Sequence, residues 1–385
     1  MKIFYAVNAR LPTEKAHGIQ IMSMCSALAE QGHEVLLVSP RRWGNGGDPF
    51  SAYGFKQTFK WQTLPVIDFL SRFPNIFTLA LEGLSFAAGA LLASRRARAD
   101  ILYLRDEWLA LIFSLFQKPF ILELHRLPSY GKWLRFINAK SLVVATTAAL
   151  AQDAKPFLRS GARIIVAHDG ADLRRFSSSL SQEEARKKLS LPVEAKIAMY
   201  VGRLEAMGME KGIYLMLEAF GQAYKNGNKN IVLAIVGGPE SAIAAYKQYL
   251  NDLGLPSGAV IFAGQRPYAE IPDWLAAADA LLMPTPASSA FFLRWTSPLK
   301  LFEYLASGRP VIATDLPSVR EVVNAESACL VPAGDAAAMG RALRLLLDNE
   351  DLRRRYGGAG RAIAEKYSWL SRGRYIIGEW AKSST

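Results

Sequence analysis

Short, largely apolar runs recur along the chain, separated by stretches with the spacing of amphipathic helices. In the first half these runs fall at residues 2–7, 35–39, 101–104, 120–124, 141–146 and 164–166. A short apolar run between turn residues is typical of a strand buried on both faces. Residues 19–31 have helical spacing and end at Gly32. The alternation predicts an α/β domain built on a doubly wound parallel sheet.

A second series of the same kind follows. Its apolar runs fall at residues 198–201, 232–236, 260–262, 280–283, 311–314 and 329–331. The Ser-rich stretch 177–184 between the two series is predicted to be a linker. The 385 residues are too many for one ordinary core. We expect an N-terminal domain over residues 1–178 and a C-terminal domain over 190–366, facing a cleft at the carboxyl edges of their strands.

Residues 75–93 form an almost unbroken apolar run with Glu82 in its middle. The run is just long enough to cross a bilayer. Glu82 and the strand run that follows favour a helix that is buried, or that rests on a membrane surface, over one that spans. The preceding stretch, residues 44–74, is rich in aromatic residues and glycine and is predicted to be irregular.

The net charge of +12 is concentrated in the first half of the chain. Residues 1–180 hold 22 Lys and Arg against 13 Asp and Glu, whereas the remainder holds 24 against 21. Such a surface suits anionic lipid or a phosphate-bearing acceptor. The basic clusters are not interleaved with aromatic residues as in single-strand binders, so nucleic acid is not an expected partner.

The cysteine and histidine content gives no sign of a metal or a disulfide framework. Cys25 and Cys329 lie far apart in apolar surroundings. His17, His33 and His168 have no spacing typical of zinc ligands. We therefore expect no metal and no cofactor, and a reducing cytosol as the compartment.

Residues 297–310 combine three features of anion binding. The pair Ser297 and Pro298 is a good helix start, with Ser297 as the expected cap. A helix N-terminus favours anions, and Lys300 adds a full positive charge in the first turn. Glu303 follows one turn later, where a carboxylate can accept hydrogen bonds from a ribose diol. An ordinary surface helix with a Lys300–Glu303 pair is the alternative.

Several motifs, taken in order, resemble the group 1 glycosyltransferases of family 4. They are Asp169-Gly170-Ala171-Asp172, Gly202-Arg203-Leu204, Glu210-Lys211-Gly212, Val236-Gly237-Gly238, Ser297-Pro298-Leu299-Lys300 and Gly308-Arg309-Pro310-Val311. The resemblance implies the GT-B fold, with two Rossmann-like domains, a nucleotide-sugar donor held mostly by the second domain, and transfer with retention and without a metal. It also implies that the terminal helix, residues 367–385, packs back on the first domain.

The resemblance assigns roles to residues of the second domain. Arg203 and Lys211 match the basic pair that holds the donor's diphosphate, and Glu303 matches the glutamate bonded to the ribose. Gly237, Arg266, Ser297, Leu299 and Lys300 match the remaining donor-binding positions, together with Gly18 in the first loop. The family's first glutamate should stand at Trp295, so this chain departs from the pattern there and the identity of the donor sugar stays open.

In the first domain, His125 follows a strand run and matches the histidine that faces the donor sugar, so His125, Arg203 and Lys211 are the expected catalytic residues. Arg105, Asp106 and Glu107 follow another strand run and are expected to position the acceptor. Asp106 and Glu107 are equally good helix caps.

These observations predict a retaining hexosyltransferase that uses a UDP- or GDP-linked sugar. The expected acceptor is a glycan or a lipid-linked molecule of the cell envelope. We expect a cytoplasmic protein, in peripheral contact with the inner face of the plasma membrane. The alternative is a degenerate protein of the same fold that binds nucleotide sugar or glycan without turnover, and Trp295 is its main support.

Overall fold

A computed structural model describes residues 1–42, 47–68, 75–116, 118–128, 131–177, 180–206, 208–227 and 229–384. Parts of the aromatic stretch, residues 43–46 and 69–74, lie outside these. The chain divides into two compact units. The first unit contains Met1–Asp169, Trp295–Ser297 and Trp369–Thr385, and the second contains Gly170–Arg294 and Pro298–Ser368. Residues 170–178 therefore belong to the second unit, whereas the sequence placed them in the first domain.

The first unit is built on a seven-stranded sheet in the order β3-β2-β1-β4-β5-β6-β7, and all its strands are parallel. The strands are β1 (Lys2–Ala6), β2 (Glu34–Arg41), β3 (Lys60–Pro65), β4 (Ile101–Leu104), β5 (Ile121–Leu124), β6 (Leu142–Ala145) and β7 (Arg163–Val166). Six of them fall on the predicted apolar runs. Strand β3 was missed because its exposed residues alternate with partly or fully buried ones, as expected at the edge of a sheet.

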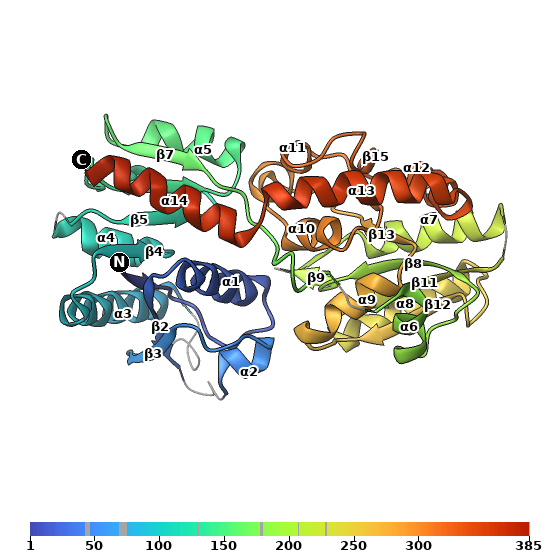
Figure 1. The fold of residues 1–385 in the computed structure, drawn as a ribbon, viewed down its shortest axis with the longest axis horizontal. Helices are drawn as coiled ribbons and strands as arrows, with labels where there is room; N and C mark the ends of the chain where they lie inside the picture. Colours follow the sequence, from blue (N-terminus) through green and yellow to red (C-terminus); the bar gives the residue numbers. More distant parts are fainter. Residues whose placement is uncertain are drawn as a thin grey trace. The chain divides into compact units, whose positions relative to one another are not determined.

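Helices lie on both sides of this sheet (Figure 1). They are α1 (Ala16–Glu30), α2 (Pro49–Tyr53), α3 (Ile76–Ala97), α4 (Glu107–Leu115), η1 (Gly131–Phe136), α5 (Ala148–Ala154), η2 (Lys155–Phe157) and α14 (Trp369–Ser384). Side chains of α3, α4 and η1 share one core with Phe4, Leu102 and Leu122 of the central strands. The terminal helix α14 packs against α1.

The second unit is built on a six-stranded parallel sheet in the order β12-β11-β8-β13-β14-β15. The strands are β8 (Lys196–Val201), β11 (Ile231–Val236), β12 (Val260–Gly264), β13 (Ala280–Met283), β14 (Val311–Thr314) and β15 (Cys329–Val331). A short antiparallel pair, β9 (Glu205–Ala206) and β10 (Met209–Glu210), follows β8. All six sheet strands match predicted runs, which confirms the second α/β unit.

Each face of the second sheet carries its own helices. These are α6 (Gln182–Lys188), α7 (Ile213–Lys225), η3 (Glu240–Ala242), α8 (Ile243–Asp252), η4 (Tyr268–Glu270), α9 (Ile271–Ala277), α10 (Leu299–Ala306), α11 (Pro317–Arg320), α12 (Ala336–Asp348) and α13 (Glu350–Lys366), with a π-helical turn η5 over Phe291–Trp295. Buried side chains of α9 and α10 pack on one face, and those of α7, α8 and α12 pack on the other.

The predicted linker is partly helical. Ser181 begins α6 through a capping box, in which its hydroxyl accepts a hydrogen bond from the Glu184 backbone and the Glu184 side chain accepts one from the Ser181 backbone. Ser and Glu three residues apart are the signature of such a start. The Ser-rich composition of this stretch was therefore misread.

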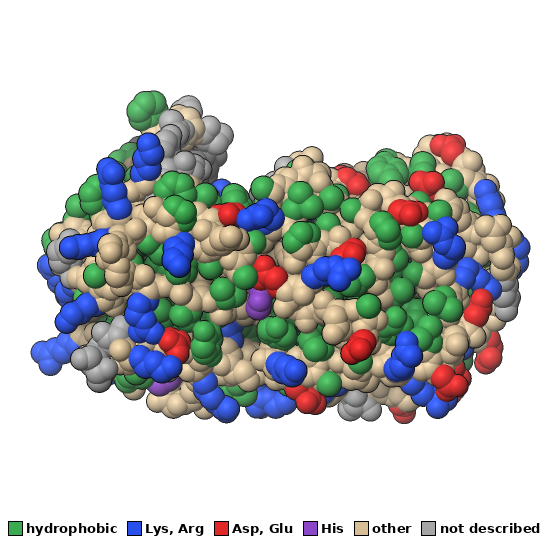
Figure 2. Space-filling view, turned by 90° about the horizontal axis from the view of Figure 1, so that it is seen from above, with side chains coloured by type: hydrophobic (Ala, Val, Ile, Leu, Met, Phe, Trp, Pro, Cys, Tyr) green, Lys and Arg blue, Asp and Glu red, His purple; other side chains and the backbone are tan. Residues whose placement is uncertain are grey.

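Surface charge differs between the two units. On the face shown in Figure 2, Lys and Arg side chains predominate over the first unit, whereas the second unit carries both signs. This agrees with the excess of basic residues in the first half of the sequence.

Candidate functional site

The predicted diphosphate-binding residues of the second unit gather around the carboxyl end of β8. Lys300, in the first turn of α10, donates a hydrogen bond to the Tyr200 hydroxyl at 2.7 Å. That hydroxyl in turn donates to the backbone carbonyl of Arg203 at 2.7 Å. Tyr200 thus fixes the first turn of α10 to the loop after β8. Sequence analysis missed this residue because, inside a strand run, it was indistinguishable from a core aromatic.

Three cations lie close enough at this edge to affect one another. Burial, and then the positive charge of Arg203, lower the pKa of Lys211. Burial, and then the charge of Lys211, hold the pKa of Lys300 well below its usual range. The Lys211 ammonium also lies 5.1 Å from the centre of the Phe292 ring. Mutual repulsion of this kind is relieved when an anion binds between the charges.

The backbone at the start of α10 adds donors to this cluster. Helix α10 begins at Leu299 with Pro298 in the cap position, and no described side chain caps it. The free amides and the positive end of the helix dipole are typical of a phosphate site. The expected cap, Ser297, was wrong: its hydroxyl accepts a hydrogen bond from the Asp169 backbone at 3.0 Å, within the first unit.

Glu303 lies on the next turn of α10 and is partly buried. Its carboxylate accepts a hydrogen bond of 2.8 Å from the Tyr268 hydroxyl. Burial raises the pKa of Glu303 to about 7, against the opposing effects of the Tyr268 hydrogen bond and of Lys300. The Arg175 guanidinium lies 4.9 Å from the centre of the Tyr268 ring. Neither Tyr268 nor Arg175 was predicted, and their spacing in the sequence carries no signal.

Gly237 and Arg266, two further predicted donor-binding residues of the second unit, lie just after strands β11 and β12. Gly237 directly follows β11 and has a φ of 151°, and a Cβ there would lie 1.9 Å from the carbonyl oxygen of Gly202. Glycine is therefore required for the close approach of the two strand ends. Arg266 is exposed, and its Nε donates to the Ala263 carbonyl at 3.0 Å.

The first unit holds His125, directly after β5. Its Nε2 lies 2.6 Å from Oε1 of Glu123 and accepts a hydrogen bond of 2.9 Å from Nε of Arg105. Burial opposes ionisation of Glu123, but the charges of Arg372 and Arg105 and the hydrogen bond to His125 outweigh it and hold the pKa of Glu123 well below its usual range. Nε2 therefore faces both a carboxylate acceptor and a guanidinium donor, and these contacts hold the ring without deciding which nitrogen of its neutral form carries the proton. Burial lowers the pKa of His125, which favours this neutral form.

Glu123 is the centre of a buried polar network that sequence analysis missed. Its carboxylate accepts hydrogen bonds from Gln20 at 2.5 Å, from Arg372 at 3.0 Å, and from the Tyr103 hydroxyl. The Tyr103 ring stacks on Tyr5, with ring centres 4.4 Å apart. A glutamate inside the apolar strand run 120–124 was the available signal, because a buried carboxylate needs partners.

The predicted acceptor residues sit where β4 passes into α4. Asp106 caps α4, since its carboxylate accepts hydrogen bonds from the backbones of Trp108 at 3.0 Å and Leu109 at 3.3 Å. Burial raises the pKa of Asp106 to about 6. Glu107 accepts a hydrogen bond of 3.3 Å from Arg126. Asp106 is thus a helix cap, which is one of the two roles that the sequence allowed for it.

Gly18 and Trp295 also belong to the first unit. A Cβ at Gly18 would lie 2.2 Å from the Tyr53 hydroxyl, so packing alone requires a glycine there. The Trp295 ring packs against the core of the first unit, and its indole nitrogen donates to Asp153 at 2.8 Å. The first unit thus holds a tryptophan at the position where the resemblance places a glutamate.

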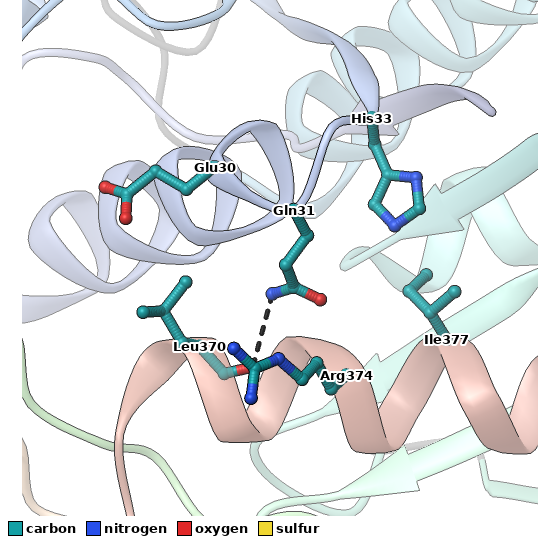
Figure 3. A pocket seen from close by; sticks show the side chains of 6 residues that line it. All are labelled: Glu30, Gln31, His33, Leu370, Arg374 and Ile377. Carbon is teal, nitrogen blue, oxygen red and sulfur yellow. Dashed lines mark hydrogen bonds between the residues drawn. The ribbon is translucent and has the colours of Figure 1, made fainter.

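A pocket in the first unit lies between the end of α1 and α14 (Figure 3). It is lined by Glu30, Gln31, His33, Leu370, Arg374 and Ile377. The Gln31 amide donates a hydrogen bond of 3.2 Å to the Leu370 carbonyl, drawn as a dashed line in Figure 3. The lining includes none of the predicted site residues. Within the described ranges, no group of three or more His, Cys, Asp or Glu side chains is placed to hold a metal ion.

Two family models match the chain, and together they cover most of both units. Residues 18–175 match the glycosyltransferase family 4 model, and residues 195–349 match a model described as glycosyl transferases group 1. The chain belongs to the group 1 glycosyltransferases of family 4. The predicted family is confirmed, and with it the two-unit α/β architecture of the GT-B fold.

Two curated relatives illustrate the likeness of this family 4 chain. It is 30% identical over 247 residues to a D-inositol 3-phosphate glycosyltransferase of Corynebacterium urealyticum, covering 62% of this chain and 56% of the relative. It is 29% identical to the putative teichuronic acid biosynthesis glycosyltransferase TuaC of Bacillus subtilis, covering 59% and 54%. The matched region thus spans about half the length of these curated relatives.

Among solved structures, the fold resembles that of HepE from Anabaena, crystallised with UDP. The two chains align with a TM-score of 0.76 over 99% of this chain and 100% of HepE, at 16% identity. At this identity the likeness shows the shared fold alone.

Proposed function

We propose that this chain is a glycosyltransferase that moves a hexose from a UDP- or GDP-linked sugar to a glycan or lipid-linked acceptor of the cell envelope. The observation that carries the proposal is the cluster of Arg203, Lys211 and Lys300 at the carboxyl end of β8. Three mutually repelling cations beside an uncapped helix start form a site for a diphosphate. The names of the relatives support glycosyl transfer, and the UDP in the HepE crystals supports the donor class.

The cations would also act on the rate of transfer. As the bond between the sugar and the diphosphate breaks, negative charge grows on the leaving phosphate oxygen. Fixed positive charges lower the energy of that state more than that of the bound donor, because they are already oriented. Arg203 can hold two phosphate oxygens, whereas the lysines act as point charges. No metal is needed for this chemistry in the proposal.

Glu303 in the second unit and His125 in the first unit have separate proposed roles toward the donor. The Glu303 carboxylate would accept hydrogen bonds from the ribose hydroxyls of the nucleotide. The Tyr268 hydroxyl would keep its hydrogen bond to the same carboxylate. His125 would form a hydrogen bond with a sugar hydroxyl through Nδ1, since Glu123 and Arg105 occupy Nε2. Arg105, Asp106 and Glu107 are proposed to position the acceptor. The reaction is proposed to retain the anomeric configuration, as in the family the motifs resemble, and to take place in the cytoplasm at the inner membrane face.

Calorimetric titration with UDP, GDP, ADP and their sugar conjugates, in the presence of a chelator, tests the donor site. We expect micromolar binding of one nucleotide. In Lys300→Ala and Arg203→Ala that binding should fall at least tenfold, while the thermal unfolding curve is kept. Lys225→Ala, an exposed lysine at the end of α7, is the matched control and should bind normally. Unchanged binding in both site variants would contradict the proposal.

The second candidate function is binding of nucleotide sugar without turnover, and Trp295 in place of the expected glutamate favours it. Incubation with the bound nucleotide sugar and envelope lipid extract distinguishes the two. Release of free UDP or GDP together with a glycosylated product, whose anomeric proton signal matches that of the donor, supports a retaining transferase. Tight donor binding without product supports the second candidate.

A further inference from the structure

The outward face of α3 is apolar, which reverses the usual pattern of a surface helix. Phe77, Leu81, Leu84 and Leu92 are all exposed, and Phe77 is 82% exposed. Their spacing of three and four residues, continued by the small exposed Ala88, places them in one stripe along the helix. Solvent-facing positions of a helix are ordinarily polar. A stripe of this kind marks a surface that another apolar phase covers.

The inward face of α3 holds the helix in the first unit. Glu82 is fully buried and pairs with Arg42, and a Cβ at Gly83 would lie 2.7 Å from the Trp108 ring. Asn75 caps the helix through a capping box. Phe77–Ala97 is the one helix in the described part of the chain that is long and apolar enough to cross a membrane, and 39% of its most apolar stretch is buried. A buried ion pair and close packing oppose spanning and favour a helix that lies along a surface.

The apolar surface continues onto the neighbouring elements. Leu115 and Phe116 at the end of α4 are exposed, and so is Phe136 in η1. The Arg95 guanidinium of α3 lies 5.3 Å from the centre of the Phe116 ring, which places the ends of α3 and α4 side by side. We call the surface formed by Phe77, Leu81, Leu84, Leu92, Leu115 and Phe116 the α3 face.

The charges around the α3 face are almost all positive. Exposed basic residues at the end of α3, just after α4, and in η1, which contacts α4, are Arg95, Arg96, Arg98, Lys118, Lys132 and Arg135. The described residues 75–140 include five acidic residues. Glu82, Asp106 and Glu123 are not exposed. Of the other two, Asp100 accepts a hydrogen bond from the Lys2 backbone, and Glu107 pairs with Arg126. An apolar stripe bordered by cations is complementary to a bilayer that contains anionic lipid.

We propose that the α3 face docks the protein on an anionic lipid bilayer, with α3 parallel to the membrane plane. Phe77 and the leucines enter the boundary between headgroups and acyl chains, while the arginines contact lipid phosphates. A second copy of this chain is a poorer occupant, because two identical basic borders would meet and repel. The proposal rests on the proposed function for its purpose, since a bound bilayer would bring a lipid-linked acceptor to the protein.

Sedimentation of the full chain with phosphatidylcholine vesicles, with and without phosphatidylglycerol, tests this docking. We expect binding to the anionic vesicles only. Leu81→Glu combined with Leu84→Glu should reduce the bound fraction at least tenfold. Leu345→Glu is the matched control, because Leu345 is a 54% exposed leucine on α12 of the second unit, and it should bind as wild type. Replacing Arg96 and Arg135 by Gln should weaken binding about fivefold for each charge removed.

Three results would overturn the proposal. They are equal binding to neutral vesicles, wild-type binding by the Leu81→Glu/Leu84→Glu variant, and a dimer in sedimentation velocity that this variant converts to monomer. Circular dichroism checks that the variant is folded, and Phe77→Ser gives a milder second variant if it is not. Nucleotide titration of the same variant keeps the two proposals separate: normal donor binding with lost vesicle binding leaves the proposed donor site intact.

Discussion

The guanidinium of Arg372 in α14 and the carboxylate of Glu123 in β5 form a buried ion pair, with Nη1 and Oε2 3.0 Å apart. Both residues are at most 5% exposed. Arg372 also donates to the carbonyls of His168 at 2.9 Å and Ala167 at 3.3 Å. The pair therefore joins the terminal helix to the network that positions His125 inside the first unit.

Removal of Arg372 should be costly, because it leaves the Glu123 carboxylate buried and short of a cation. We expect Arg372→Met to lower the free energy of unfolding by about 3–5 kcal/mol, as when one partner of a buried pair is lost. Arg374→Met, on the exposed side of the same helix, should stay within about 0.5 kcal/mol of wild type. Urea unfolding followed by circular dichroism measures both.

The double variant Arg372→Met/Glu123→Gln separates the ion pair from simple packing. Removing the unpaired charge should recover a large part of the lost stability. A double variant less stable than Arg372→Met alone would show that the arginine acts through its packing and its backbone contacts.

Glu303 should make donor binding depend on pH. Its pKa of about 7 means that the carboxylate becomes ionised only near neutrality, and an ionised carboxylate is the better acceptor for the ribose hydroxyls. We expect the affinity for the preferred nucleotide sugar to rise between pH 6 and pH 8, centred near the Glu303 pKa of about 7. In Glu303→Gln the affinity should fall about 10- to 100-fold and lose this pH dependence.

The same carboxyl group should lower stability at high pH. Between its ordinary pKa of 4.5 and its folded value of about 7, the folded protein holds a proton that the unfolded chain has released. Stability therefore falls as pH rises through this window, by up to about 1.4 kcal/mol per pH unit. Glu303→Gln should melt at a higher temperature than wild type at pH 8. A lower melting temperature there would contradict the assignment of a raised pKa.

Asp106 combines a structural role with a proposed functional one, and two variants separate them. Asp106→Ala should cost about 1 kcal/mol through loss of the helix cap, whereas Asp106→Asn keeps the cap and the stability. If the charge also positions the acceptor, Asp106→Asn should raise the acceptor KM with little change in donor affinity. Steady-state kinetics and thermal unfolding measure the two effects. An Asn variant with wild-type kinetics would leave Asp106 as a cap only.

The sequence predicted the two sheets well because their strands are buried on both faces and read as continuous apolar runs. Lys211 and Lys300 could be proposed from the sequence as donor-binding residues because they accompany glycines and a helix start. Tyr200, Tyr268 and Arg372 were not, because each acts through a partner that is remote in sequence. Lys300, for example, is 100 residues from the hydroxyl it contacts. Such pairings depend on tertiary structure and cannot be predicted from the local sequence pattern.

The contacts of Trp295 predict that replacing it by the family's glutamate lowers the stability of the protein. Its ring packs on the core of the first unit and its indole nitrogen donates to Asp153. Trp295→Glu would remove that packing and set a second carboxylate beside Asp153. We expect a loss of about 2–3 kcal/mol, whereas Trp295→Phe, which keeps the ring and loses one hydrogen bond, should cost about 1 kcal/mol.

The double variant Trp295→Glu/Asp153→Asn tests the repulsion directly in thermal unfolding. It should be more stable than Trp295→Glu alone, because one of the two charges is gone. Equal stability of the two variants would mean that lost packing accounts for the whole effect. If Trp295→Glu instead matched wild type and raised transfer, position 295 would be free to contact the donor sugar. On the contacts observed, the tryptophan serves the core of the first unit, and the donor sugar must be recognised by other residues.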